Sequence, residues 1–420
     1  MVKTVSIITL GCKVNFTDSQ QIAEALRDRG FAVVFDGANA DISIINTCTV
    51  TARADYQSRQ QIRRAARATR NMPVIVTGCA SSVFPERILD ASPGAVIVPP
   101  DDQDGIVDAV SSLIGIPEAP QSDLSTVTRT RAFLKIQEGC NAGCAYCIVP
   151  QARGRERSEP PDEVLRRLSD LVRHGYKEVV LVGIHLGKYG SDLKGQSVTL
   201  AGLIGLIEES ALEARFRLSS IEPMELTDEL LSVVGRSRVI APHLHIPVQS
   251  GDDSILESMG RPYRRSDIER VVENVANRFR DPAVGIDVMA GFPGEGTREF
   301  SNTIDLIRSL PVSYLHVFPF SNRPNTRAST MSGHVPTAEK TARARVAREL
   351  GAKKKQDYIA RNIGRVVTVL VESHDAGVVR GKSENYLDVY IAGTREDLNS
   401  FVAVVLERPF RGGAYGRRPI

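Results

Sequence analysis

Residues 138–151 have the sequence Glu-Gly-Cys-Asn-Ala-Gly-Cys-Ala-Tyr-Cys-Ile-Val-Pro-Gln, in which three cysteines follow the spacing C-x-x-x-C-x-x-C. These cysteines, the loop triad, are Cys140, Cys144 and Cys147. Gly139 and Gly143 allow the backbone to fold tightly, because glycine adopts conformations that other residues avoid. One loop can therefore direct three sulfur atoms at a common point.

Three thiolates in one loop favour a soft metal centre, since thiolates select zinc, copper(I) or iron–sulfur clusters. A structural zinc site takes four protein ligands and usually uses C-x-x-C pairs. No histidine or fourth cysteine stands near this array. The array therefore favours a four-iron cluster with one iron open to a ligand or substrate. Three unrelated buried thiols would be the alternative, but cysteine is rare elsewhere in the chain.

The length and composition bound the class of protein. A chain of 420 residues is too long for one ordinary hydrophobic core, so two or three domains are expected. The net charge of +3 neither requires nor excludes a nucleic-acid partner. No apolar run has the length of a membrane span, and the first ten residues predict a strand, not a secretory signal. We therefore expect a cytoplasmic protein with reduced thiols and no membrane partner.

Three times in the first 80 residues, a strand-like run is followed by a cysteine and then by a helical pattern. These cysteines, the amino-terminal triad, are Cys12, Cys48 and Cys79. We expect the first helix to begin at Thr17 or Asp18, which are good caps. Ligands of an open parallel sheet bind beyond the carboxyl ends of its strands, so the three thiols are predicted to meet and hold a second cluster. The alternative is three small buried side chains at strand ends.

The remaining chain predicts two further domains. A Pro-rich stretch at 115–123 predicts a linker. Alternating strands and helices from residue 132 to residue 318 then predict a parallel barrel or partial barrel, with the cysteine loop at its carboxyl face. A helix rich in lysine and arginine is expected at 336–362. Short alternating strands from residue 366 onward predict a small antiparallel barrel.

Along its whole length, the chain resembles the radical S-adenosylmethionine (SAM) methylthiotransferases. Tyr146 matches the aromatic residue that usually precedes the last cysteine of their cluster loop. The motifs that carry the resemblance include Gly-Cys-Lys-Val-Asn at 11–15, Asn-Thr-Cys-Thr-Val at 46–50, Thr-Gly-Cys-Ala at 77–80, Arg-Gly-Arg-Glu-Arg-Ser at 153–158, Val-Gly-Ile-His-Leu-Gly at 182–187 and His-Leu-His-Ile-Pro-Val-Gln-Ser-Gly at 243–251. The motifs at 11–15 and 183–187 are most similar to the MtaB-type branch, which modifies threonylcarbamoyladenosine in tRNA.

The resemblance implies an α/β protein of three domains. These are an amino-terminal Rossmann-like parallel-sheet domain (1–120), a radical SAM core with a partial (β/α)6 barrel (125–362) and a TRAM RNA-binding domain (363–420). It also implies SAM and two [4Fe–4S] clusters. The loop triad would hold the cluster that cleaves SAM to a 5′-deoxyadenosyl radical. The amino-terminal triad would hold the auxiliary cluster, which presents the sulfur to be methylated and transferred to adenine C2. The implied partners are the tRNA anticodon stem-loop and a reductant such as flavodoxin or ferredoxin.

Further site residues are predicted with less specific signals. Contacts to SAM or to the base are expected from Tyr146 in the cysteine loop and, at strand ends, from Glu222, Gln249, Asp287 and His316. Contacts to RNA are expected from Arg153, Arg155, Arg323, Lys353, Lys354, Arg411 and Arg417, with Arg323 a candidate partner for the threonylcarbamoyl carboxylate. Structural hydrogen bonds or a solvated basic surface would be the alternatives. His185 and His243 are equally consistent with core histidines. The usual Gly-Gly-Glu motif of radical SAM enzymes is replaced here by Gly183-Ile-His185, so its SAM contact cannot be assigned.

Three other functions stay open at this point. The target could be isopentenyladenosine in tRNA, or an aspartate of a ribosomal protein. A non-catalytic RNA-binding protein stabilised by structural zinc is a more distant alternative. The ligand count favours the enzyme, because structural zinc needs four ligands and each triad offers three.

Overall fold

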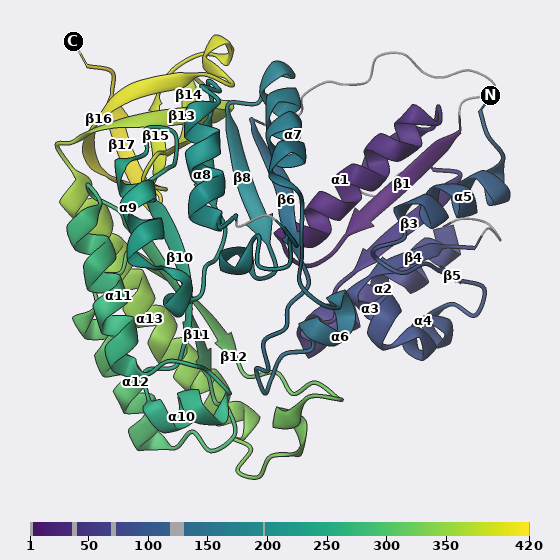
Figure 1. Ribbon diagram of the computed structural model, residues 1–420, viewed down its shortest axis with the longest axis horizontal. Coiled ribbons are helices and arrows are strands. Elements are labelled where there is room, and N and C mark those ends of the chain that lie inside the picture. The colour runs from purple at the N-terminus through teal and green to yellow at the C-terminus, as the bar shows by residue number, and fades with distance from the viewer. Residues whose placement is uncertain (1–2, 36–39, 69–72, 118–129, 196–197, 420) are drawn as a thin grey trace. The chain divides into compact units, whose positions relative to one another are not determined.

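A computed structural model describes residues 3–35, 40–68, 73–117, 130–195 and 198–419 (Figure 1). The chain divides into two compact units. The first comprises Met1–Thr126, Glu138–Glu156 and Ser321–Ser329, and the second comprises Val127–Gln137, Arg157–Phe320 and Thr330–Ile420. The loop triad therefore belongs to the same unit as the amino-terminal triad. Most of the predicted linker at 115–123, and the predicted boundaries at residues 120 and 125, lie outside the described residues.

The first unit is built on a five-stranded sheet in which the neighbouring strands are parallel, in the order β2-β1-β3-β4-β5. The strands are β1 Thr4–Thr9, β2 Ala32–Phe35, β3 Ile42–Thr47, β4 Ile75–Gly78 and β5 Val96–Ile97. Every residue of β3 and β4 is buried. The Rossmann-like parallel sheet is confirmed. Strand β2 was not predicted, although its sequence Ala-Val-Val-Phe is apolar; it is a short edge strand of four residues, none of them buried.

Helices cover both faces of this sheet. They are α1 Lys13–Asp28, α2 Ala52–Ala68, α3 Cys79–Val83, α4 Pro85–Ala91 and α5 Gln103–Ile114. One apolar cluster joins α1 and α5 to the sheet, and another joins α2, α3 and α4 to it. The prediction that α1 begins at Thr17 or Asp18 is wrong, because the helix already begins at Lys13 with Cys12 as its capping residue.

In the second unit, seven strands form a four-stranded and a three-stranded sheet, which isolated bridges join between Phe216 and Ile240 and between Ser220 and His245. The strands are β6 Arg131–Glu138, β8 Glu178–Gly183, β9 Arg215–Leu218, β10 His243–Gln249, β11 Ala283–Ala290 and β12 Tyr314–Pro319, and a short strand, β7 Arg157–Ser158, flanks β6. The pairings β6–β8, β8–β9, β10–β11 and β11–β12 are all parallel. No pairing between β6 and β12 closes the ring within the described residues. The predicted partial barrel is confirmed.

Helices pack around these strands and enclose the largest apolar core of the chain (Figure 1). They are α7 Pro161–Arg173, α8 Leu200–Glu209, α9 Asp228–Arg236, α10 Asp253–Ser258, α11 Arg265–Arg278, α12 Thr297–Ser309 and α13 Thr337–Asn362. A short helix, α6 Val149–Arg153, follows the cysteine loop in the first unit. No helix among the described residues is both long enough and apolar enough to cross a membrane.

Residues 366–417 form a closed barrel with the strand order β13-β14-β15-β17-β16. Its strands are β13 Val366–Asp375, β14 Val378–Ser383, β15 Asp388–Ala392, β16 Phe401–Phe410 and β17 Gly413–Arg417. All pairings are antiparallel as predicted except that of β15 with β17, which is parallel. The basic carboxyl-terminal segment is therefore not a free tail, because β16 and β17 include it in the barrel.

A buried ionic network lies at the start of β8. Glu178 is fully buried, and its Oε2 accepts hydrogen bonds from Arg215 Nε at 2.5 Å and Arg217 Nη2 at 2.9 Å. Arg131 Nη1 lies 3.7 Å from the other carboxylate oxygen. Burial works against ionisation, but the two guanidinium groups of Arg217 and Arg215 lower the pKa of Glu178 to about 2. The carboxylate is therefore charged at neutral pH.

The same two arginines bind the carboxyl-terminal barrel. Arg215 donates to the carbonyl oxygens of Thr368 and Lys382, both at 3.0 Å, and Arg217 donates to that of Glu384 at 3.1 Å. Glu178 offsets part of their charge, and the carbonyl oxygens accept their remaining N–H groups, so the guanidinium groups can be buried between the two barrels of the second unit. The network thus fixes the carboxyl-terminal barrel against the partial barrel.

Candidate metal centres and active site

The amino-terminal triad converges at the carboxyl edge of the first sheet. Cys12 precedes α1, Cys48 follows β3, and Cys79 follows β4. Asn15 Oδ1 lies 3.7 Å from the Cys12 sulfur and 3.9 Å from the Cys79 sulfur. Residues separated by 67 positions along the chain are therefore brought together around one side-chain oxygen, as the sheet topology predicts.

Two glycines allow the loops to approach each other. Gly11 and Gly78 have φ values of +107° and +89°, which side chains other than hydrogen rarely accept. A Cβ atom at Gly78 would lie 2.4 Å from Asn46 Oδ1, and one at Gly11 would lie 2.8 Å from Cys48 Cβ. Glycine is therefore required on both sides of the triad.

Two buried asparagines hold these loops in place. Asn15 Nδ2 donates to the carbonyl oxygens of Leu10 and Thr47, both at 2.8 Å, and Asn46 Nδ2 donates to the Asn15 carbonyl oxygen at 2.8 Å. Sequence reasoning assigned no role to either residue. For Asn46, the sequence signal was a polar residue near the end of a mostly apolar strand. For Asn15, it was a polar residue three positions after Cys12.

Burial differs across the amino-terminal triad. Cys48 and Cys79 are buried, whereas Cys12 is exposed, so the triad is open on the side of Cys12. Burial raises the pKa of the Cys48 thiol to about 12 and also raises that of Cys79, against the opposing charge of Arg153. Without a bound cation these thiols are protonated at neutral pH. Metal binding must therefore release their protons.

Arg153 is buried and does not face solvent, with 5% of its surface exposed. Its guanidinium donates to Asn15 Oδ1 at 2.6 Å, to Asp18 Oδ2 at 2.6 Å and to the Cys79 sulfur at 3.3 Å. This position corrects the prediction that Arg153 contacts the tRNA backbone, since a buried guanidinium engaged by protein side chains is not presented to RNA.

The loop triad is shaped by backbone hydrogen bonds. The Cys147 amide donates to the Cys144 carbonyl oxygen at 3.2 Å, and the Cys140 amide donates to that of Gly154 at 3.1 Å. The Ala142 amide points at the Cys140 sulfur, 3.3 Å away. All three thiols are half-buried, so they can reach a bound group that is itself accessible.

Gly139 is the tightest point of this loop. It has a φ of +71°, and an added Cβ atom would lie 1.9 Å from the Arg155 carbonyl oxygen. We expect Gly139→Ala to displace the loop and to lower the iron content of the purified protein by about half. The clashing atom belongs to the backbone, so it cannot move aside as the end of a flexible side chain could. Gly143→Ala is the matched control, because nothing lies within 4 Å of a Cβ atom there. Equal iron contents in the two variants would contradict this expectation.

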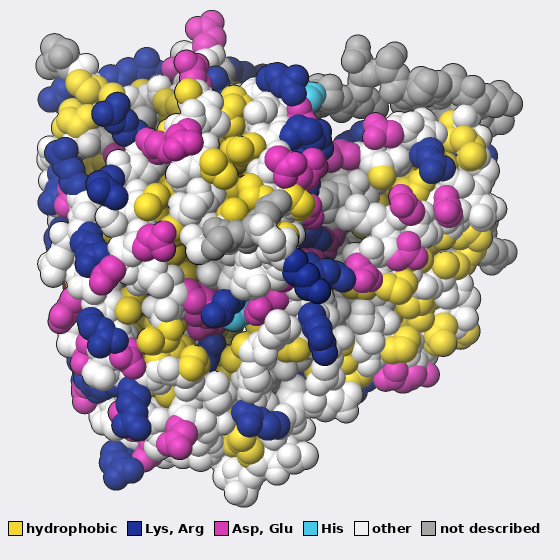
Figure 2. Space-filling model, viewed as in Figure 1, with side chains coloured by type: hydrophobic (Ala, Val, Ile, Leu, Met, Phe, Trp, Pro, Cys, Tyr) yellow, Lys and Arg dark blue, Asp and Glu magenta, His cyan; other side chains and the backbone are white. Residues whose placement is uncertain are grey.

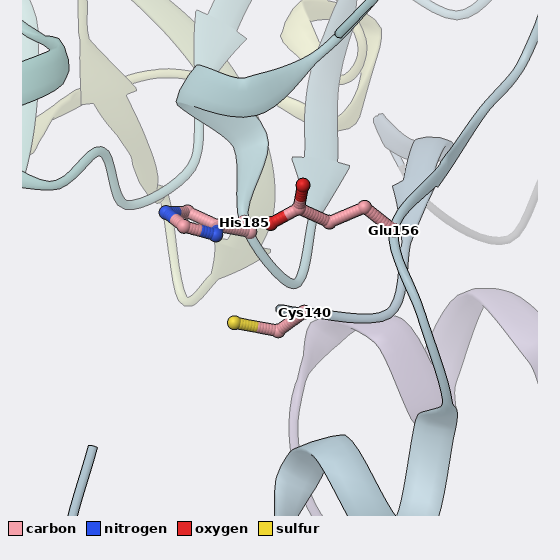
Figure 3. A group of neighbouring side chains, drawn as sticks. All are labelled: Cys140, Glu156 and His185. Carbon is pink, nitrogen blue, oxygen red and sulfur yellow. The ribbon is translucent and has the colours of Figure 1, made fainter. Parts of the chain in front are cut away.

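An open pocket of about 450 Å³ adjoins the first cysteine of the loop. It is lined by Cys140, Asn141, Pro150, Gly154 and Arg155. Glu156 stabilises the cysteine loop. Its carboxylate accepts hydrogen bonds from the backbone nitrogen of Asn141 at 3.2 Å and from the side-chain nitrogen of the same residue at 3.1 Å. Figure 3 shows the Cys140 and Glu156 side chains on neighbouring stretches of chain. The exposed Arg155 thus lies at the pocket beside the loop triad.

A polar cluster lies on strands β10, β11 and β12 of the second unit. Asp287 and His316 are direct partners across β11 and β12. Asp287 Oδ1 accepts from His245 Nε2 at 2.8 Å and lies 3.4 Å from His316 Nδ1. Burial opposes ionisation, but these hydrogen bonds lower the pKa of Asp287 to about 2. The ligand atoms of the three side chains lie within 4.8 Å of one another, a spacing that would also accept a metal ion.

Glu222 and Gln249 lie in the same unit, and Glu222 has an unused polar group. Glu222 Oε1 pairs with Arg261 at 2.8 Å, whereas its Oε2 is buried without a hydrogen-bond partner among the described residues. Gln249 is buried at the end of β10 with a φ of +67°, where the strand register shifts. His185 pairs with Glu225 at 2.6 Å. A free buried carboxylate oxygen is suited to a donor group of a bound ligand.

The other predicted contact residues are dispersed. Arg323 is buried and donates to Thr49 Oγ1 at 2.6 Å, which leaves its Nε without a partner among the described residues. Lys354 donates to the carbonyl oxygens of Arg308 and Leu310 and thereby caps α12. Tyr146, in the cysteine loop, is half-buried, whereas Lys353, Arg411 and Arg417 are exposed. Figure 2 shows basic and acidic side chains interspersed over the helices of the second unit, without a large area of one sign.

Comparisons with known proteins identify the family. Residues 4–99 match the uncharacterized protein family UPF0004, and residues 134–307 match the radical SAM superfamily. The threonylcarbamoyladenosine tRNA methylthiotransferase MtaB of Thermotoga maritima is 37% identical over 405 residues, which cover 94% of this chain and 92% of the relative. The chain belongs to the radical SAM methylthiotransferases.

Two more distant similarities complete this comparison. The tRNA-2-methylthio-N6-dimethylallyladenosine synthase of Novosphingobium aromaticivorans is 30% identical, covering 94% of this chain and 93% of the relative. The radical SAM methyltransferase TsrM from Kitasatospora setae, solved with cobalamin and a [4Fe–4S] cluster, has a TM-score of 0.56 at 16% identity, covering 78% of this chain and 77% of TsrM. The second similarity concerns the fold alone.

Radical SAM methylthiotransferases use SAM and [4Fe–4S] clusters, and the residues of this chain fit these groups. The chain has six cysteines, and they form two sets of three, each on one loop or at one sheet edge. Three soft thiolates leave one iron of a four-iron cluster open, whereas structural zinc would need a fourth ligand. Iron–sulfur chemistry therefore suits both triads of this methylthiotransferase better than zinc does.

Proposed function

We propose that this protein transfers a methylthio group to carbon 2 of N6-threonylcarbamoyladenosine at position 37 of tRNA. The observation that supports this substrate is similarity over nearly the whole chain. The MtaB relative of Thermotoga maritima is 37% identical, against 30% for the relative named for dimethylallyladenosine. Both relatives are named for tRNA nucleosides, so tRNA is the proposed substrate in either case.

The two triads have separate proposed roles. Cys140, Cys144 and Cys147 would hold the cluster that binds SAM, and Cys12, Cys48 and Cys79 would hold the auxiliary cluster. When bound, these groups supply the radical that attacks an unactivated C–H bond and the sulfur that replaces the hydrogen. The chain itself positions the loop triad beside the pocket at Cys140, and it keeps two of the three auxiliary thiols away from water.

The substrate and SAM are proposed to contact polar residues of the partial barrel, some at the carboxyl ends of its strands and some in the middle of β10, β11 and β12. These are Glu222, Gln249, Asp287 and His316, to which the structure adds His245. The low pKa of Asp287 keeps its carboxylate charged, so it orients the ring nitrogens of His245 and His316 as donors. The His316 side chain is 55% exposed, and we propose that its other ring nitrogen contacts a ligand.

The carboxyl-terminal barrel is proposed to be a TRAM-type RNA-binding domain. Arg411 and Arg417 are exposed, and the Arg411 guanidinium lies 5.1 Å from the centre of the Phe410 ring. Arginine beside an aromatic ring suits phosphate contact and base stacking. We further propose a cytoplasmic location, where the thiols stay reduced, and a low-potential reductant such as flavodoxin or ferredoxin.

The test is mass spectrometry of tRNA nucleosides from a strain that lacks this protein, with and without complementation. The expected result is loss of the methylthio form of threonylcarbamoyladenosine and its return on complementation, because the deletion removes the proposed enzyme and complementation restores it. Unchanged amounts of that nucleoside, with loss of methylthio-isopentenyladenosine, would overturn the substrate while keeping the family. If neither nucleoside changes, the ribosomal-protein target must be tested next.

A further inference from the structure

The Arg153 guanidinium donates a hydrogen bond to a cysteine sulfur within the first unit. Arg153 Nε lies 3.3 Å from the Cys79 sulfur, and Nη2 donates to Asn15 Oδ1 at 2.6 Å. Asn15 in turn lies against the Cys12 and Cys79 sulfurs. The guanidinium is thus aimed at the amino-terminal triad by two routes, one direct and one through Asn15.

The charges around Arg153 explain why it can be buried. Nη1 pairs with Asp18 at 2.6 Å and with Glu138 at 3.3 Å. Arginine keeps its charge in proteins, and the carboxylates of Asp18 and Glu138 offset the cost of burying it. A buried cation of this kind is stable only while its anionic partners remain. The group therefore stays charged beside the triad.

The origin of Arg153 in the sequence connects the two triads. Arg153 is the last residue of α6, six positions after Cys147, whereas Asn15, Asp18 and Cys79 belong to α1 and α3. Contacts between α3 and α6 are extensive in the first unit. A single segment thus carries three thiols for one cluster and a cation for the other.

We propose that Arg153 is a positioning residue that raises the reduction potential of the cluster on Cys12, Cys48 and Cys79 through its hydrogen bond to the Cys79 sulfur. A reduced cluster carries one more negative charge than an oxidised one, so a nearby cation stabilises the reduced form. Hydrogen bonds to ligating sulfurs and net charge are established determinants of cluster potential. The inference rests on the proposed assignment of the auxiliary cluster to these three cysteines.

The experiment uses the full chain with Cys140, Cys144 and Cys147 replaced by alanine, so that the auxiliary cluster alone gives a signal. A redox titration followed by electron paramagnetic resonance measures its midpoint potential. We expect Arg153→Gln to lower the reduction equilibrium constant at least tenfold, which corresponds to a shift of about 59 mV for one electron. Arg64→Gln, an exposed site on α2 with the same change in charge, should leave the potential unchanged.

A second variant distinguishes an electrostatic effect from damage to the site. Asp18→Asn removes a countercharge of Arg153 and keeps the side-chain shape, so it should shift the potential upward, opposite to Arg153→Gln. If Arg153→Gln fails to bind iron, the midpoint potentials of Asp18→Asn and Arg153→Lys test the proposal instead. The potential of Arg153→Lys is expected to lie between that of the parent and the value expected for Arg153→Gln. Unshifted potentials in these variants would overturn the proposal. A parent protein that binds no iron would overturn the cluster assignment and the proposal with it.

Discussion

Replacing Glu178 with alanine will lower the free energy of unfolding of the second unit by about 3–5 kcal/mol. The substitution leaves Arg215 and Arg217, which are bonded to Glu178 at 2.5 and 2.9 Å, buried without their countercharge. Because both guanidinium groups also bind carbonyl oxygens of the carboxyl-terminal barrel, that barrel should loosen from the partial barrel. Urea unfolding followed by circular dichroism measures the loss, and limited proteolysis reports the loosening.

The matched control is Glu269→Ala, which also removes one carboxylate from an ion pair in the second unit. Glu269 pairs with Arg265 at 2.9 Å on the surface of α11, with 37% of its side chain exposed. An exposed pair contributes less than about 1 kcal/mol, because water and salt screen it. Similar losses of stability in the two variants would contradict the importance of the buried network.

The contribution of Glu178 also has a defined pH dependence. Its pKa in the folded chain is about 2, below the ordinary value of 4.5, so the charged form stabilises the folded state. This contribution is fully present above about pH 4.5 and is lost as the pH falls from 4.5 towards 2. The stability difference between the natural chain and Glu178→Gln should therefore be constant near neutral pH and should shrink below pH 4.5. A difference that stays constant down to pH 3 would contradict this assignment.

Replacing Cys12, Cys48 and Cys79 together with alanine will abolish formation of the methylthio nucleoside but leave conversion of SAM to 5′-deoxyadenosine. Replacing Cys140, Cys144 and Cys147 will abolish both. Each triple variant should keep about four irons, half of the parent content, because alanine offers no ligand to one cluster and leaves the other intact. Iron analysis, product chromatography and nucleoside mass spectrometry give the three measurements.

Each triple variant is the control for the other, because each removes three thiols from the same unit. Retention of the full iron content in either variant would show that its cysteines are not ligands. Zinc in place of iron, or loss of all iron in both variants, would contradict two independent clusters. Loss of SAM cleavage in the amino-terminal variant would contradict the separation of roles.

Most of the fold followed from local patterns. Apolar runs of period two predicted β1, β3 and the strands of the partial barrel, and the helix expected at 336–362 is α13, which spans Thr337–Asn362. The start of α1 did not follow, because Thr17 and Asp18 satisfy the local rules for a cap but are buried inside the helix. Asp18 is instead the partner of Arg153, a residue 135 positions away.

The sequence by itself determined which residues can serve as cluster ligands and how they group. Ligand chemistry is carried by residue type, and the loop triad needs only the spacing of one short stretch. The amino-terminal triad could be predicted from the rule that the carboxyl ends of parallel strands meet at one edge of the sheet. Only the tertiary structure decided which charged side chains are buried and which groups they bind, because a surface arginine and a buried arginine have the same local sequence pattern. Arg153 and Asn15 lie 138 positions apart, and Arg215 binds Thr368 across 153. The role of an ionised side chain depends on its burial and on partners that only folding brings near.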